Sequence, residues 1–256
     1  MPRFSANLGF LWADLPLIER VERASAAGFR AIELHWPYET PAEDVRAACV
    51  EHGMTLLGIN TPAGERVGDF GLAAVPGREE EFMAAADLAL DYCRAAGGTM
   101  IHVLAGVVPN ELRVQARETL LRNLRSLAAR ADDLTLLLEP INHVDKPGYF
   151  YSRPDDACRI IERVGAVNLR LMFDLYHAAH EEDDVLASLV ASYDFIGHVQ
   201  IAGYPHRQEP DEGLLDCEPV LRWLDERGYE GWIGAEYHPR AAVEDGLCWK
   251  ERWQTT

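Results

Sequence analysis

Residues 134–143 read LTLLLEPINH, an apolar run that ends in a glutamate, Glu139, followed at once by a proline. The run is too short and too apolar for a half-exposed antiparallel strand, so it predicts a strand that is buried on both faces. A carboxylate at the end of such a strand loses its hydration, which is costly unless something pairs with it. The rest of the chain should therefore supply a partner for Glu139, either an arginine or a bound cation.

Seven other short apolar runs resemble this one, and amphipathic segments separate them along the whole chain. Each run is expected to form a buried strand of the same kind. The runs are RFSANLGF (3–10), RAIELHW (30–36), MTLLGINT (54–61), TMIHVLAG (99–106), LRLMFDLYH (169–177), IGHVQIAG (196–203) and GWIGAEYH (231–238).

The amphipathic segments carry the start and stop signals of helices. Capping residues precede, and glycines follow, three of these segments: Asp14 and Gly28, the capping box Thr40-Pro41-Ala42-Glu43 and Gly53, and Ser152, Asp155 and Gly165.

Strand and helix repeated eight times predict an α/β fold, a single (β/α)8 TIM barrel that spans residues 1–256. A doubly wound sheet is the alternative, and it usually has a glycine-rich phosphate loop after its first strand. The first turn here reads GFLWADL and has no G-x-G-x-x-G pattern. The barrel is therefore preferred.

Charge and cysteine content limit the class of protein. The formal net charge of −18 would repel nucleic acid and anionic membranes, so neither is expected as a partner. The five cysteines contain no Cys-x-x-Cys pair, which argues against a disulfide framework or a thiolate zinc site. The N-terminus lacks the apolar core of a signal peptide, and no uncharged apolar stretch reaches the ~20 residues that cross a bilayer. We expect a cytoplasmic protein.

One predicted loop is unusually long. Residues 62–78, PAGERVGDFGLAAVPGR, contain four glycines, and loops of this length in compact domains are mostly functional or disordered. We hypothesise that the segment is a mobile lid over the active site.

Polar residues end the last four predicted strands. In a TIM barrel the active site lies at the carboxyl ends of the strands, where Glu139, Asp174, Gln200 and Glu236 would meet. All four offer hard oxygen ligands, which suit Mg²⁺ or Mn²⁺ better than copper or a structural zinc. The four residues predict one divalent cation, and an ion pair with an arginine remains the alternative for Glu139.

Several stretches give the chain a family resemblance over nearly its whole length: RFSANL, NTPAG, PGREEEF, LLLEPINH, FDLYH, GHVQIAG and GAEYHP. With these stretches the chain resembles the hydroxypyruvate isomerase family, a branch of the xylose-isomerase-like barrels that includes 2-oxo-tetronate isomerases. The segments LEPIN and DLYH are specific in combination.

The resemblance implies that Glu139, Asp174, Gln200 and Glu236 are metal ligands and that Glu139 and Glu236 are the acid/base pair. One segment departs from the pattern. The family usually has a Gly-Glu-Ile-Asn-Tyr-like segment after the seventh strand, where this chain has Gly213-Leu214-Leu215-Asp216.

Other polar residues near the strand ends are candidates for binding substrate. His177 follows Asp174 by three residues, and Asn60 and His102 end the third and fourth predicted strands. Arg207, with His206 beside it, could hold a carboxylate in bidentate fashion. We interpret His180 as a surface residue, and three aromatic residues could either line the pocket or pack in the core: Trp12, Trp36 and Tyr38.

The resulting hypothesis is a metal-assisted isomerase of a small hydroxy-carbonyl acid. The resemblance implies conversion of hydroxypyruvate to tartronate semialdehyde through an enediolate. A 2-oxo-tetronate isomerase or a ketose epimerase would use the same site. A metal-dependent endonuclease and a barrel that binds metabolites without catalysis are the rivals, and a homo-oligomer is left open.

Overall fold

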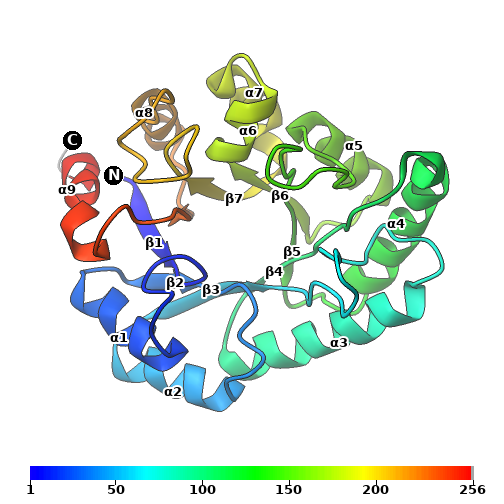
Figure 1. Ribbon diagram of the computed structural model, residues 1–256, viewed down its shortest axis with the longest axis horizontal. Coiled ribbons are helices and arrows are strands. Elements are labelled where there is room, and N and C mark those ends of the chain that lie inside the picture. The colour runs from blue at the N-terminus through cyan, green and yellow to red at the C-terminus, as the bar shows by residue number, and fades with distance from the viewer. Residues whose placement is uncertain (255–256) are drawn as a thin grey trace.

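Eight parallel strands close into a barrel in the computed structural model, which describes residues 1–254 (Figure 1). Each strand pairs with its neighbours in the sequence, and β1 closes the ring against β8. The strands are β1 (Arg3–Asn7), β2 (Ala31–Glu33), β3 (Thr55–Asn60), β4 (Met100–His102), β5 (Thr135–Leu138), β6 (Leu169–Asp174), β7 (Ile196–Ile201) and β8 (Trp232–Ala235).

The helices surround this barrel as an outer ring (Figure 1). They are α1 (Leu17–Ala26), α2 (Ala42–Glu51), α3 (Glu79–Ala96), α4 (Arg113–Ala128), α5 (Pro154–Val164), α6 (Leu175–Glu181), α7 (Val185–Ser192), α8 (Glu218–Glu226) and α9 (Cys248–Gln254), with short 3₁₀ turns at Asn110–Leu112, Tyr193–Phe195 and Val243–Gly246. This order confirms the predicted (β/α)8 barrel. The last two residues of the predicted 1–256 span lie outside the described residues.

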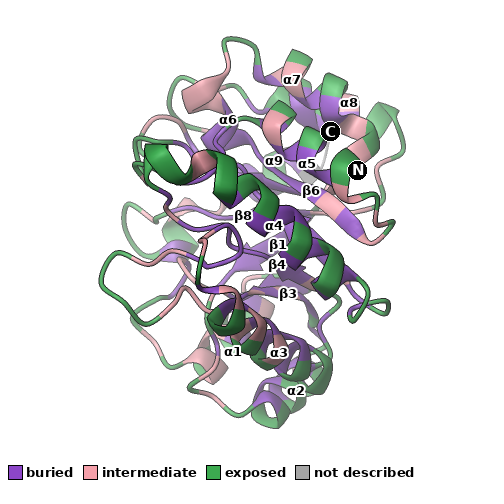
Figure 2. Cartoon of the chain, turned by 90° about the vertical axis from the view of Figure 1, so that its right-hand side faces the viewer, coloured by how far each residue is buried: buried purple, intermediate pink, exposed green. Residues whose placement is uncertain are grey.

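The strands are mostly buried, as their purple colour in Figure 2 shows. Helices cover the outside of such a barrel and side chains fill its inside. In β5, Leu136 and Leu138 are fully buried. Each helix turns one apolar face inward, as α5 does with Ile160 and Ile161, and leaves its outer face exposed. The alternation of apolar runs and amphipathic segments in the sequence therefore corresponds to this inner layer of strands and outer layer of helices.

The predicted helix ends are confirmed, because Gly28, Gly53 and Gly165 all follow helices with positive φ. The predicted starts are wrong for these three helices. The N-cap residues are Pro16, Pro41 and Arg153, and none of them makes a side-chain capping hydrogen bond.

Proline explains this shift. In α5, Pro154 is the first helical residue, where its fixed φ and missing N–H are tolerated. In α1 and α2, Pro16 and Pro41 occupy the N-cap position itself, so no side-chain oxygen is available there to cap the helix. Asp14, Thr40 and Ser152 consequently lie before the N-cap positions.

The strand register aligns the carboxyl ends of the strands. Asp174 lies opposite Gln200, and Gln200 lies opposite Gly234. Glu139 and Glu236 each follow the last residue of their strand, β5 and β8. The four predicted ligands therefore reach the same end of the barrel.

Segment 62–78 divides into two parts. Residues 71–74 are buried, and their backbone is held by hydrogen bonds from Ala73 N to Leu104 O and from Ala74 N to Ala105 O. Residues 65–68 are exposed and form the tip of the loop. Arg66 N donates to Asp69 Oδ2, and Asp69 pairs with Arg78 at the end of the segment. A lid, if formed, is therefore expected of residues 65–68 and not of residues 71–74.

The five cysteines are free, and four of them are buried. No helix among residues 1–254 is long and apolar enough to span a bilayer.

Candidate active site

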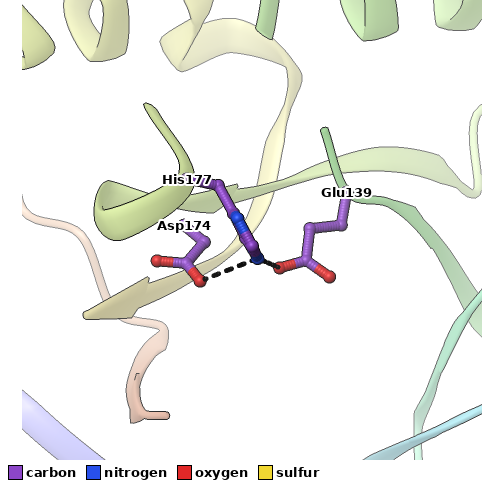
Figure 3. Close-up of side chains that lie close together, drawn as sticks. All are labelled: Glu139, Asp174 and His177. Carbon is purple, nitrogen blue, oxygen red and sulfur yellow. Dashed lines mark ion pairs between the residues drawn. The ribbon is translucent and has the colours of Figure 1, made fainter. Parts of the chain in front are cut away.

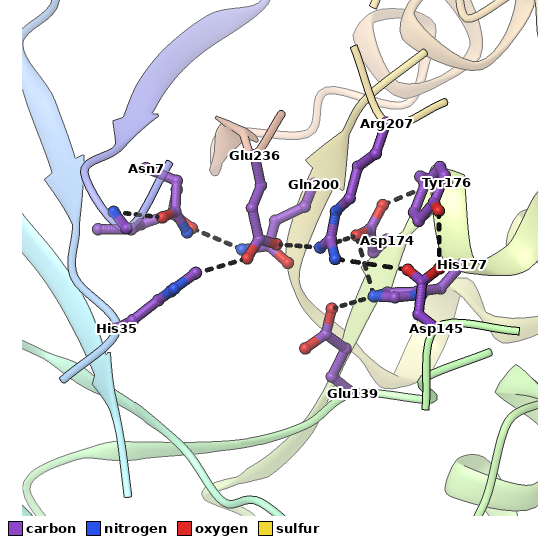
Figure 4. Close-up of polar contacts among 12 residues, drawn as sticks. Asn7, His35, Glu139, Asp145, Asp174, Tyr176, His177, Gln200, Arg207 and Glu236 are labelled. Carbon is purple, nitrogen blue, oxygen red and sulfur yellow. Dashed lines mark hydrogen bonds and ion pairs between the residues drawn. The ribbon is translucent and has the colours of Figure 1, made fainter. Parts of the chain in front are cut away.

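Four polar side chains from consecutive strands lie buried at the carboxyl end of the barrel (Figure 4). They are Glu139, Asp174, Gln200 and Glu236, each exposed by 6% or less. Burial of three carboxylates in one place is unfavourable unless cations or hydrogen-bond donors neutralise them. The surrounding residues show how this chain does so.

Glu139, Asp174 and His177 form the tightest cluster (Figure 3). One potential ligand atom from each lies within 4.8 Å of the others. His177 Nε2 is 3.6 Å from Glu139 Oε1 and 3.8 Å from Asp174 Oδ2. This cluster could hold a metal ion.

The tautomer of His177 decides whether its Nε2 can bind a metal ion or can only donate a hydrogen bond. Its Nδ1 accepts hydrogen bonds from the backbone N–H of Asn142 and from the Asn142 amide, which is 2.6 Å away. The amide orientation is fixed because Asn142 Oδ1 accepts from Val144 N and Asp145 N. The neutral ring therefore carries its proton on Nε2. An N–H between two carboxylates is a hydrogen-bond donor, so His177 suits a donor role better than metal ligation.

Arg207 supplies the positive charge of the site. Its Nη2 lies 3.2 Å from Glu236 Oε2 and 3.4 Å from Asp174 Oδ2. The guanidinium stacks between the rings of Phe10 and Tyr176, with its carbon 4.8 and 5.0 Å from the ring centroids. The φ of Arg207 is 52°, a left-handed conformation that costs a non-glycine residue about 1 kcal/mol. Strain of this kind is characteristic of functional sites.

Burial and mutual repulsion set the charge states of the carboxylates. Burial, with the charges of Glu236 and Asp174, raises the pKa of Glu139 well above its usual range. Burial also raises the pKa of Asp174 to about 7, although Arg207 opposes it. Arg207 and His35 outweigh burial at Glu236 and lower its pKa to about 2. Without a cation, the cluster retains protons that a dication would displace.

Buried oxygens that make no hydrogen bond test whether a metal fits. They are Glu139 Oε1, Gln200 Oε1 and Glu236 Oε2, of which Glu236 Oε2 forms an ion pair with Arg207 at 3.2 Å. Buried polar atoms in native proteins are seldom left this way unless a water or an ion completes them. Three such oxygens beside Asp174 fit a hard divalent cation.

His35 is a site residue that the sequence prediction missed. Its Nε2 lies 2.7 Å from Glu236 Oε1. A Cβ at residue 9 would lie 2.1 Å from the His35 ring, so Gly9 leaves the space that this ring occupies. His35 comes just after β2, and the rule that located the ligands on the late strands would have found it.

His102 approaches the other glutamate. Its Nδ1 lies 3.3 Å from Glu139 Oε2, and burial lowers the pKa of His102 to about 3. The ring is therefore neutral near pH 7. Asn60 and His102 line the same pocket as Glu139, Gln200 and Glu236. Their contact with substrate stays a prediction.

Other candidates lie away from the pocket or have packing roles. His206 is exposed, whereas Arg207 beside it points into the site. The interpretation of His180 as a surface residue is wrong, because its ring packs between Tyr176 and Tyr204. Trp12 and Tyr38 pack against other aromatic rings. Trp36 is exposed beside His35, and Leu214 is exposed.

Comparison with known proteins agrees with this geometry. Residues 21–253 match the xylose isomerase-like TIM barrel family. The chain is 44% identical to a 2-oxo-tetronate isomerase from Cupriavidus necator, over 97% of both chains. It is 36% identical to the hydroxypyruvate isomerase from Escherichia coli, over 99% of this chain and all of the other.

A solved structure from Brucella melitensis, described as an AP endonuclease of family 2, superimposes with a TM-score of 0.95. It is 36% identical and covers 98% of this chain and 99% of its own. The chain therefore belongs to the xylose isomerase-like TIM barrel family, in the group that includes 2-oxo-tetronate and hydroxypyruvate isomerases.

Proposed function

We propose that this protein is an isomerase that exchanges the carbonyl and hydroxyl groups of a small 2-oxo-3-hydroxy acid. Hydroxypyruvate and a 2-oxo-tetronate share this unit and differ by one hydroxymethyl group on carbon 3. The two relatives support this substrate class. The observation that carries the proposal is a pair of buried glutamates, Glu139 after β5 and Glu236 after β8, which line one polar pocket.

We propose one divalent cation per chain, Mg²⁺ or Mn²⁺, held by Glu139, Asp174, Gln200 and Glu236. The buried oxygens that make no hydrogen bond support this set. When bound, the cation would polarise the substrate carbonyl and stabilise negative charge on its oxygen.

The chain's own residues move the protons. One glutamate takes the proton from carbon 3 of the substrate, and the other delivers a proton to carbon 2 of the enediolate. The hydroxyl proton passes from oxygen 3 to oxygen 2, so that carbon 3 becomes the carbonyl and carbon 2 carries the hydroxyl. His35 is hydrogen-bonded to Glu236 and His102 lies beside Glu139, so each carboxylate is held in one orientation. The two glutamates thus act from separate sides of the pocket.

Arg207 and His177 bind the substrate in this proposal. The guanidinium is pre-oriented by its two aromatic neighbours and presents donors to a carboxylate. The Nε2–H of His177 can donate to a substrate oxygen. An acid would therefore be preferred over a neutral sugar.

A turnover assay tests the function. The purified chain is incubated with Mg²⁺ or Mn²⁺ and with hydroxypyruvate or a four-carbon 2-oxo-tetronate, and isomers are followed by NMR. We expect metal-dependent interconversion of at least one acid. No isomer from either acid, with bound metal confirmed, would leave a metabolite-binding barrel as the better account.

The endonuclease rival is weaker, despite the description of the Brucella melitensis structure. A net charge of −18 opposes binding to DNA, which depends on neutralising phosphates. Cleavage of an abasic-site oligonucleotide by the purified chain at physiological salt would support the endonuclease hypothesis. A cytoplasmic location and a homo-oligomer stay predictions.

Metal binding is expected to strengthen as the pH rises from about 5 toward 7. The pKa of Asp174 is raised to about 7, chiefly by burial, so a proton competes with the cation below that pH. Affinity should fall about tenfold per pH unit for each proton displaced. Calorimetry in two buffers of different ionisation enthalpy measures the released protons. An affinity that is constant between about pH 5 and 7 would contradict the assignment.

The exposed tip of segment 62–78 is expected to order when ligand binds. Phe70 links the tip to the site residue His35, because its ring packs against Trp36, which in turn packs against His35. Closure would exclude water from the enediolate. Hydrogen exchange at residues 65–70 should slow at a saturating substrate analogue, while residues 71–74 stay protected throughout. Unchanged exchange at the tip would rule out a lid.

A further inference from the structure

Glu33 is a second buried carboxylate beside the site, and it is not among the proposed metal ligands. It ends β2 and contacts β1 and β7 through three polar side chains. Its Oε1 accepts from Ser5 Oγ, and its Oε2 accepts from Gln200 Nε2 at 2.8 Å. His198 Nε2 lies 3.1 Å from the same Oε2. The carboxylate is therefore surrounded by donors.

This surrounding suits a carboxylate, because both Glu33 oxygens face side chains that can donate: Ser5 at Oε1, and Gln200 and His198 at Oε2. An ionised carboxylate only accepts hydrogen bonds. The Gln200 amide must consequently turn its Nε2 toward Glu33, and its Oε1 must point the other way.

The freed oxygen faces the proposed cation site. Gln200 Oε1 is buried without a hydrogen-bond partner. The strand register places Gln200 opposite Asp174, and Gln200 lines one pocket with Glu139 and Glu236. An amide turned the other way would aim an NH₂ group at the cation.

The backbone makes room for this pair. A Cβ at residue 234 would lie 2.5 Å from Glu33 Oε1 and 2.9 Å from Gln200 Cγ. Gly234 lies within β8, where a glycine usually marks a close approach. The missing side chain at this position is what admits the Glu33 carboxylate next to Gln200.

We propose that Glu33 is a positioning residue that locks the Gln200 amide with its oxygen directed at the cation. This inference rests on the metal site proposed above. Residues that orient a ligand in this way typically contribute about 10–100-fold to metal affinity.

Glu33→Gln tests it, because a glutamine at 33 can donate its own NH₂ to Gln200 Oε1 and allow the amide to turn over. We expect the dissociation constant for Mn²⁺, measured by calorimetry on the metal-free chain, to rise about 10–100-fold. Ser5→Ala is the matched control, because it removes the bond to the other Glu33 oxygen and leaves Oε2 with Gln200. The control should bind Mn²⁺ nearly as tightly as the wild type.

Thermal unfolding of the metal-free chains separates positioning from simple stabilisation. A structural role alone would lower the melting temperature of both variants and leave Mn²⁺ affinity alone. The inference would be overturned if Glu33→Gln bound Mn²⁺ as tightly as the wild type, or if both variants lost Mn²⁺ affinity equally. The proposed function would not fall with it, because turnover by the wild-type chain tests that function separately. A wild-type chain that binds no divalent cation would overturn both.

The wild-type chain provides a second measurement, which covers the case that Glu33→Gln does not fold. The side-chain amide of Gln200 should give one slowly exchanging pair of NMR signals before Mg²⁺ is added, and the pair should shift at saturating Mg²⁺. An averaged pair, or one that Mg²⁺ leaves unchanged, would overturn the inference.

Discussion

Glu139→Gln and Glu236→Gln should each lower turnover by at least about 10²–10⁴-fold, the usual contribution of a general acid or base. Glutamine keeps an oxygen that can ligate a metal but cannot accept a proton from carbon. The loss should therefore appear in kcat even when metal is bound. Glu236→Gln also removes the charge that Arg207 and His35 neutralise.

Metal content has to be measured beside the rate, because weaker metal binding would add to the loss. Glu79→Gln is a matched control, since it makes the same change at a glutamate that begins α3, outside the site, and contacts Thr119 and Arg122. It should retain wild-type turnover. A metal-replete Glu236→Gln chain that isomerises substrate at the wild-type rate would contradict the paired-glutamate mechanism.

Asp174→Ala should abolish high-affinity metal binding. Asp174 is the charged ligand from the strand between those of Glu139 and Gln200, and its side chain is fully buried. Replacing it with alanine removes an anionic oxygen and leaves Arg207 without one of its counter-charges. Calorimetry with Mn²⁺ measures the loss directly.

A second variant separates ligation from folding. Asp174 Oδ1 also accepts from Tyr176 N at the start of α6, and loss of an N-cap costs about 0.5–2 kcal/mol. Asp174→Asn keeps that cap and loses only the charge. We expect it to fold with near-normal stability and to bind Mn²⁺ weakly. Wild-type affinity in either variant would show that the site is assigned incorrectly.

The fold could be predicted from the sequence because a buried parallel strand leaves a distinctive mark. Runs such as LTLLLEPI have no polar face, and only a sheet covered on both sides accommodates eight of them. The ends of these runs also located the buried polar cluster, since parallel strands bring their carboxyl ends together. Glu139 and Asp174 both lie where this rule placed them.

The early strands show where that reading was incomplete. The rule for strand ends was applied to the late strands and not to β2, so Glu33 and His35 were missed although RAIELHW contains both. The orientation of the Gln200 amide and the tautomer of His177 depend on partners distant in sequence, Glu33 and Asn142. No local pattern encodes such contacts.

The burial of loop residues also could not be predicted from local sequence patterns. Arg207 and His206 are adjacent in sequence, yet the half-buried Arg207 contacts the carboxylates of the site and His206 is exposed. The backbone has a positive φ at Arg207. The length of segment 62–78 suggested a lid, but buried contacts hold residues 71–74 in place. Tertiary packing decides both outcomes.

The central claim is that two glutamates move a proton between carbons of a 2-oxo-3-hydroxy acid with the help of a divalent cation. Isomerisation in D₂O, followed by NMR with Mg²⁺ present and after chelation, tests it most directly. The account predicts deuterium from solvent at carbon 2 of the product, dependent on metal and lost in Glu139→Gln and Glu236→Gln. Product formed without solvent deuterium, or formed equally well after chelation, would contradict it.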